Sequence, residues 1–80
     1  MSSRGKNKIP AWYERLHVKK VFEVEGENDF RYEVGVKEDR ITGAVWLFIA
    51  KVIPRGNYAK TVLRIPLKIA KEIAEKVLEL

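Results

Sequence analysis

The chain has 80 residues, of which 46% are hydrophobic and 34% are charged. This length favours one domain with a small core, and the longest apolar run, from Ala44 to Ala50, is far shorter than the roughly 20 residues of a membrane helix. The absence of cysteine excludes disulfides, thiolate zinc sites and cysteine nucleophiles. Sixteen Lys and Arg residues against eleven Asp and Glu give a net charge of +5, which is typical of proteins that bind polyanions.

The first eight residues have no hydrophobic periodicity and are rich in Ser, Gly, Asn and basic side chains. We therefore expect a flexible basic tail over residues 1–8, with Arg4, Lys6 and Lys8 available to phosphate, and one domain over residues 9–80. No charged-then-apolar signal segment opens the sequence, so we expect a cytoplasmic protein, either free or associated with the nucleoid or the ribosome. The many Lys, Glu, Ile and Val residues resemble the composition of thermophile proteins and favour an archaeal source.

The first half of the chain predicts a short helical turn and a β-hairpin. Pro10 suits the first position of a helical turn that runs toward Leu16. From Leu16 to Val24 apolar residues alternate, with Lys20 as the interruption, and residues 25–29 are turn formers. Residues 30–37 alternate without a break, so they predict the second strand of the hairpin.

The second half predicts two more strands and a helix. Residues 44–53 are apolar at both odd and even positions, which indicates a strand covered on both faces, and residues 54–57 break it before a fourth strand over 58–65. Pro66 suits a helix start, and the 3, 4 spacing of apolar residues over 67–80 predicts an amphipathic helix that packs on the sheet. The expected fold class is α+β, a four-stranded antiparallel sheet followed by one C-terminal helix.

Motifs that carry catalytic chemistry are missing from the sequence. His17 is the single histidine, and no spacing of carboxylates around it suggests a metal site. There is no glycine-rich phosphate loop and no nucleophile elbow. We therefore expect a protein that is not an enzyme and that uses no cofactor, no metal and no small-molecule substrate.

Strand 44–53 and its neighbours indicate a binding surface. Val45, Leu47, Ile49 and Ile53 can face the helix, which sends Trp46, Phe48 and Val52 to the other side. Basic residues are expected beside these aromatic rings or in the adjoining turn, at Arg31, Lys37, Arg55, Lys60 and Arg64. Aromatic rings that stack on bases, with cations that follow phosphates, are typical of surfaces that bind single-stranded nucleic acid.

The order of four strands and a helix, entered through residues 61–70, resembles a known domain type. It is similar to the single-stranded DNA-binding domain of the positive cofactor four coactivators and to the related Pur-type modules. This resemblance covers residues 17–80. It implies a homodimer that binds single strands along the sheet surface and has a basic flexible arm before the fold.

Several alternatives remain open at this stage. The second face of strand 44–53 either is buried by a partner subunit or stacks on bases, and both can hold in one protein, so a homodimer is expected. The alternative is that Trp46 and Phe48 simply belong to the core. The nucleic acid is single-stranded DNA or irregular RNA. A small ribosomal or chromatin-associated protein with a basic arm is a second hypothesis, and a protein-interaction module, in which charge serves solubility only, is a third.

Overall fold

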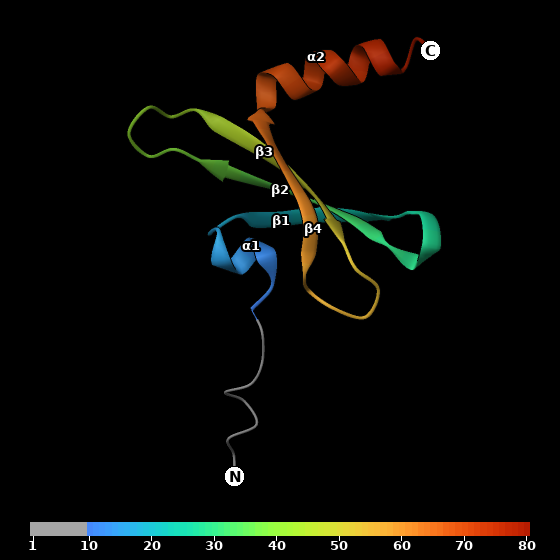
Figure 1. The fold of residues 1–80 in the computed structure, drawn as a ribbon. Coiled ribbons are helices and arrows are strands. Elements are labelled where there is room, and N and C mark those ends of the chain that lie inside the picture. Colours follow the sequence, from blue (N-terminus) through green and yellow to red (C-terminus); the bar gives the residue numbers. More distant parts are fainter. Residues whose placement is uncertain (1–9) are drawn as a thin grey trace.

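The computed structural model describes residues 10–80, so the predicted tail and its Arg4, Lys6 and Lys8 lie outside the described residues. A four-stranded antiparallel sheet followed by a C-terminal helix is confirmed (Figure 1). The elements in chain order are α1 (Trp12–Arg15), β1 (Lys19–Glu25), η2 (Glu27–Asp29), β2 (Arg31–Glu38), β3 (Val45–Val52), β4 (Ala59–Pro66) and α2 (Leu67–Val77). Each predicted strand and both predicted helices are present, with ends that differ by a few residues.

The strands form a simple meander in the order β1-β2-β3-β4. Lys37 pairs with Trp46, and Gly35 and Arg64 flank Phe48 from the two neighbouring strands. Side chains alternate between the two faces of a sheet, so these residues share one face. We call it the α1 face, because α1 lies on this side, and we call the opposite side, which carries Phe22, Val34, Ile49 and Leu63, the open face.

A β-bulge explains the interruption of the alternation in β1. Lys20 pairs with Gly35 whereas Phe22 pairs with Val34, so Val21 is an extra residue in this strand. The bulge changes which positions point to each side. Lys20 therefore lies on the α1 face, while Phe22 lies on the open face.

The hydrophobic core lies between α1 and the sheet. It consists of Trp12, Val18, Phe48, Ala50 and Val52, and the Trp12 and Phe48 rings are 6.4 Å apart between centroids. The prediction that Phe48 and Val52 lie away from the helix-covered core is therefore wrong, since Phe48 is 7% exposed and Val52 is fully buried. The reason is that α1, and not α2, covers the sheet, and Trp12 brings its large ring onto the even-numbered positions of β3.

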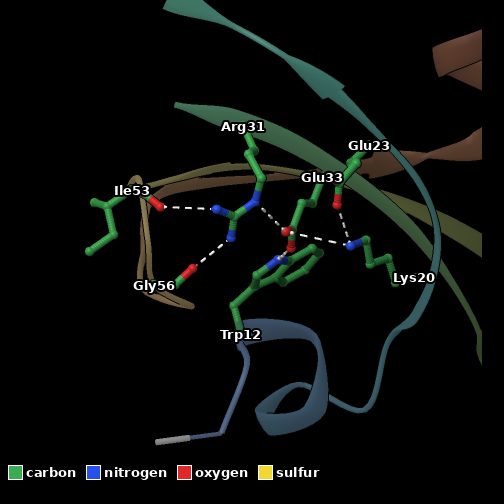
Figure 2. Close-up of polar contacts among 7 residues, drawn as sticks. All are labelled: Trp12, Lys20, Glu23, Arg31, Glu33, Ile53 and Gly56. Atoms are coloured by element: carbon green, nitrogen blue, oxygen red, sulfur yellow. Dashed lines mark hydrogen bonds and ion pairs between the residues drawn. The ribbon is translucent and has the colours of Figure 1, made fainter. Parts of the chain in front are cut away.

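A buried carboxylate fixes α1 on this face. Glu33 is 4% exposed and accepts a hydrogen bond from Trp12 Nε1 at 2.8 Å and another from Arg31 Nε at 3.1 Å (Figure 2). Lys20 Nζ lies 3.5 Å from Oε2, the carboxylate oxygen that also accepts the bond from Arg31. Arg31 also donates to the carbonyl oxygens of Ile53 and Gly56, so one network joins α1, the two strands β1 and β2, and the β3–β4 loop.

Helix α2 does not lie across its own sheet. It begins directly after Pro66, the last residue of β4, and extends past the ends of the strands (Figure 1). Its apolar residues Ile69, Ile73 and Val77 are about half exposed, so the prediction that this helix packs on the sheet is wrong for a single chain. No residues separate β4 from α2, so the chain cannot reverse its direction there. Among residues 10–80, no helix is long and apolar enough to cross a membrane.

Candidate nucleic-acid interface

A groove of about 840 Å³ is lined by the β2–β3 loop and by strand residues, most of them on the α1 face, while Lys19 and its partner Val36 are at open-face positions at the edge of the groove. Its floor includes Phe48, and two acidic residues, Glu38 and Asp39, lie at its wall. The remaining polar and aromatic lining, which we call the cationic groove, consists of His17, Lys19, Lys37, Arg40, Trp46 and Arg64. Positively charged side chains thus outnumber carboxylates in a concave site that contains a tryptophan.

Trp46 and Arg64 form the centre of the cationic groove. They come from neighbouring strands, and the guanidinium carbon of Arg64 lies 4.6 Å from the centroid of the Trp46 ring. This is a cation–π contact, which holds a long, exposed side chain in a defined place. Within residues 10–80, Arg64 has no salt bridge, so its charge is available to an anion.

Lys37 connects the groove to the end of α1. It lies opposite Trp46 in the β2–β3 ladder, and its Nζ donates a hydrogen bond to the carbonyl oxygen of Leu16 at 2.9 Å. His17, which follows Leu16 in the sequence, has a positive φ of 59°, and this conformation turns the chain from α1 into β1. The turn and the lysine together place His17 at the wall of the groove.

The β2–β3 loop contributes to the lining of the groove and donates hydrogen bonds to one of its acids. The Asp39 carboxylate accepts hydrogen bonds from the backbone N–H groups of Ile41, at 2.8 Å, and Thr42, at 3.4 Å. These bonds stabilise the ionised form, so the pKa of Asp39 lies below its usual value. The neighbouring Arg40 is exposed and adds positive charge to the groove.

The structure brings together three of the predicted site residues, Lys37, Trp46 and Arg64. Phe48 reaches the same groove only as a buried floor beneath Trp12, so its ring is not a free stacking surface. Arg31 is on the predicted face, but its guanidinium is held by Glu33 and by the two loop carbonyls. It therefore supports the fold and does not line the groove.

Two other predicted residues lie away from the groove. Val52 pairs with Ala59 and Lys51 pairs with Thr61, so a second irregularity leaves Lys60 unpaired in β4. Lys60 Nζ lies 5.9 Å from the Phe30 ring, where Lys51 also lies, and the prediction that Lys60 and Arg64 share one face is wrong. Arg55 is in the β3–β4 loop with a φ of 58°, beside a different hollow.

The sequence reasoning missed His17, Lys19 and Arg40 as groove residues. For Arg40 a signal was present, because a hairpin that joins Lys37 to Trp46 must place the connecting loop next to that tryptophan. The positions of His17 and Lys19 depend on the positive φ at His17 and on the bulge that follows, and neither feature has a clear signature in the sequence.

No protein-family model, curated protein or solved structure matches this chain. The resemblance to the positive cofactor four and Pur-type domains therefore stays a prediction based on the order of the elements. Within residues 10–80, no group of three or more His, Asp or Glu side chains is arranged to hold a metal ion. The cationic groove is thus the best-defined candidate site among the described residues.

Proposed function

We propose that the protein binds single-stranded DNA or RNA in the cationic groove. The observation that carries this proposal is the Trp46–Arg64 pair in the groove, in which the guanidinium carbon lies 4.6 Å from the centroid of the indole ring. The indole is partly exposed, and the guanidinium has no salt bridge within the described residues. An indole offers a stacking surface to any base, and arginine offers hydrogen bonds to phosphate. Lys37, Lys19 and Arg40 add positive charge to the lining of the same groove.

The shape of the site favours a single strand over a duplex. Trp46 lines a groove together with residues of the β2–β3 loop, so a base must leave its stack to reach the indole. Bases in a single strand are free to do so, whereas in a duplex they are stacked and paired. The groove chemistry is shared by DNA and RNA, and both are therefore tested.

The rival function is a protein-interaction module whose charge serves only solubility. The exposed apolar residues of the open face and of α2 favour an assembly surface. The central groove residues Trp46 and Arg64 lie on the opposite face of the sheet, so nucleic-acid binding and assembly are compatible in one protein.

The test is a titration of fluorescently labelled oligo(dT) and oligo(U) with the full chain, read by anisotropy at several salt concentrations. Trp46→Ala should weaken binding by about 1–3 kcal/mol with little change in the salt dependence, because it removes stacking. Arg64→Ala should lower the slope of log K against log salt by about 0.7, the value for one phosphate contact on a single strand. Arg15→Ala is the matched control, since Arg15 is exposed and lies outside the groove.

Folding of each variant is checked by circular dichroism. If folded Trp46→Ala and Arg64→Ala bind as the parent does, the groove is not the binding site. If, in addition, deletion of residues 1–8 abolishes RNA binding, the ribosomal hypothesis, in which the globular part positions a basic arm, takes its place. If the parent binds no nucleic acid at low salt, the proposed function is wrong and the interaction module remains.

A further inference from the structure

The open face of the sheet presents large apolar side chains that nothing covers in the described chain. Phe22, Val24 and Leu63 are 53%, 53% and 49% exposed, and they come from the two edge strands β1 and β4. Ile49 of the central strand β3 lies between them in the ladder. An apolar surface that spans a whole sheet is uncommon on a monomer and is typical of an interaction site.

Helix α2 presents a second uncovered apolar surface. Ile69, Ile73 and Val77 recur at a spacing of four residues, so they form one stripe, and they are 43%, 50% and 54% exposed. An amphipathic helix in a globular protein buries such a stripe against another element. In one chain this does not happen, because α2 leaves the sheet at the end of β4 (Figure 1).

The dimensions of the molecule also indicate a missing layer. Its extent in the thinnest direction is 16 Å, which a single sheet with one short helix on one face accounts for. The open face therefore has no second layer of its own.

We propose that two copies form a symmetric dimer in which α2 of each copy lies on the open face of the other. In a dimer with a two-fold axis, α2 of each copy covers the open face of the other copy. The same contact, made twice, therefore buries both the helix stripe and the open face. The sizes agree. The 11 residues of α2 make a helix about 16 Å long, and four strands span about 14 Å between the outer strand axes.

Charge favours a second copy over a membrane or a nucleic acid as the occupant of these surfaces. The segment 67–80 carries three Lys and three Glu residues, although the whole chain has a net charge of +5. A helix that binds an anionic membrane surface has a polar side rich in Lys and Arg. The balanced charge of α2 suits contact with another protein surface and gives no attraction to phosphate groups.

The first experiment is sedimentation of the full chain at tens of micromolar concentration without nucleic acid. We expect a dimer for the parent and a monomer for Ile73→Glu, which places a charge at the centre of the helix stripe. Lys71→Gln is the matched control, because it changes the charge by the same amount on the polar side of α2 and should leave the dimer intact. Phe22→Lys tests the sheet face independently, in case Ile73→Glu fails to fold.

The second experiment tests which surfaces meet. The chain has no cysteine, so Leu63→Cys and Ile73→Cys each introduce a single thiol, one on the open face and one on α2. We expect a short bis-maleimide to link an isotope-labelled Leu63→Cys chain to an unlabelled Ile73→Cys chain after the two are unfolded together and refolded. The same reaction with Lys71→Cys in place of Ile73→Cys should give no heterodimer product.

A parent chain that sediments as a monomer overturns the proposal, and binding of that monomer to phosphatidylserine vesicles would assign the surfaces to a membrane instead. A dimer that folded Ile73→Glu and Phe22→Lys leave intact also overturns it, as does the absence of a Leu63–Ile73 product. None of these readouts uses nucleic acid. Failure of the dimer proposal would therefore leave the proposal for the cationic groove unaffected, and the reverse also holds.

Discussion

At the scale of single residues, Glu33 is the polar group on which the arrangement of the α1 face depends. Its carboxylate is almost fully buried, and the described residues contain no buried side-chain polar atom without a partner. The charge is compensated by Arg31 and Lys20, while Trp12 adds a neutral donor at 2.8 Å. One acid therefore fixes the tryptophan that covers Phe48, and with it the floor of the cationic groove.

We predict that Glu33→Gln lowers the free energy of unfolding by about 1–3 kcal/mol, the usual value for hydrogen bonds to a charged group. The amide keeps the volume of the side chain but presents an N–H₂ group to donors that need an acceptor. Urea denaturation followed by tryptophan fluorescence measures the change. Glu23→Gln is the control, because Glu23 is an exposed partner of Lys20 and its loss should change stability little. Equal losses of unfolding free energy in the two variants would show that the buried Glu33 network contributes no more to stability than the exposed Lys20–Glu23 pair.

At the scale of elements, the sequence predicted every strand and both helices, because alternation, turn formers and prolines act locally. It did not predict which face of β3 is buried. Four residues at α1 decide that question through a long-range contact between Trp12 and Phe48, and local periodicity carries no information about it. The same limit applies to Lys60, where a shift in register reversed the expected side.

The turn between β1 and β2 is tied to β3 by a single carboxylate. The Glu27 carboxylate forms an ion pair with Lys51 Nζ at 2.7 Å and accepts a hydrogen bond from the Tyr32 hydroxyl at 3.0 Å. These contacts, with the Lys51 bond as the largest cause, lower the pKa of Glu27 from its ordinary 4.5 to about 2. A folded-state pKa below the unfolded value means that the carboxylate stabilises the fold above pH 4.5 and that this contribution is lost as the pH falls toward 2.

We therefore predict that Glu27→Gln is less stable than the parent at pH 6 and that the difference disappears between about pH 4.5 and pH 2. The difference should be small, because the Glu27 side chain is exposed to solvent, and it should shrink in high salt. Urea midpoints at a series of pH values measure it. Glu75→Gln is the comparison at pH 6, since Glu75 has no ion pair within residues 10–80 and its substitution should change the urea midpoint less than Glu27→Gln does.

At the scale of the whole molecule, the two faces of the sheet have different roles. On the α1 face, a four-residue helix and a buried carboxylate complete the core and leave the cationic groove open at one end. The open face and α2 are left without cover, so a chain of this size keeps little of its apolar surface for its own core. The proposed dimer resolves this shortage, because small domains gain stability by self-association when their own core is limited.

If folding and dimerisation are coupled, the melting temperature must depend on protein concentration. A dimer that unfolds to two separate chains is favoured by mass action at high concentration, and a tenfold change in concentration is worth about 1.4 kcal/mol. For two chains of 80 residues this corresponds to a shift of about 3–6 °C in the melting temperature. Differential scanning fluorimetry at 5 and 50 µM, monitored by intrinsic tryptophan, should show this shift for the parent and for Lys71→Gln. Ile73→Glu, if it folds, should melt at a lower temperature that does not change with concentration. A parent chain that melts at the same temperature at both concentrations would show that the sheet and its short helix α1 are stable alone.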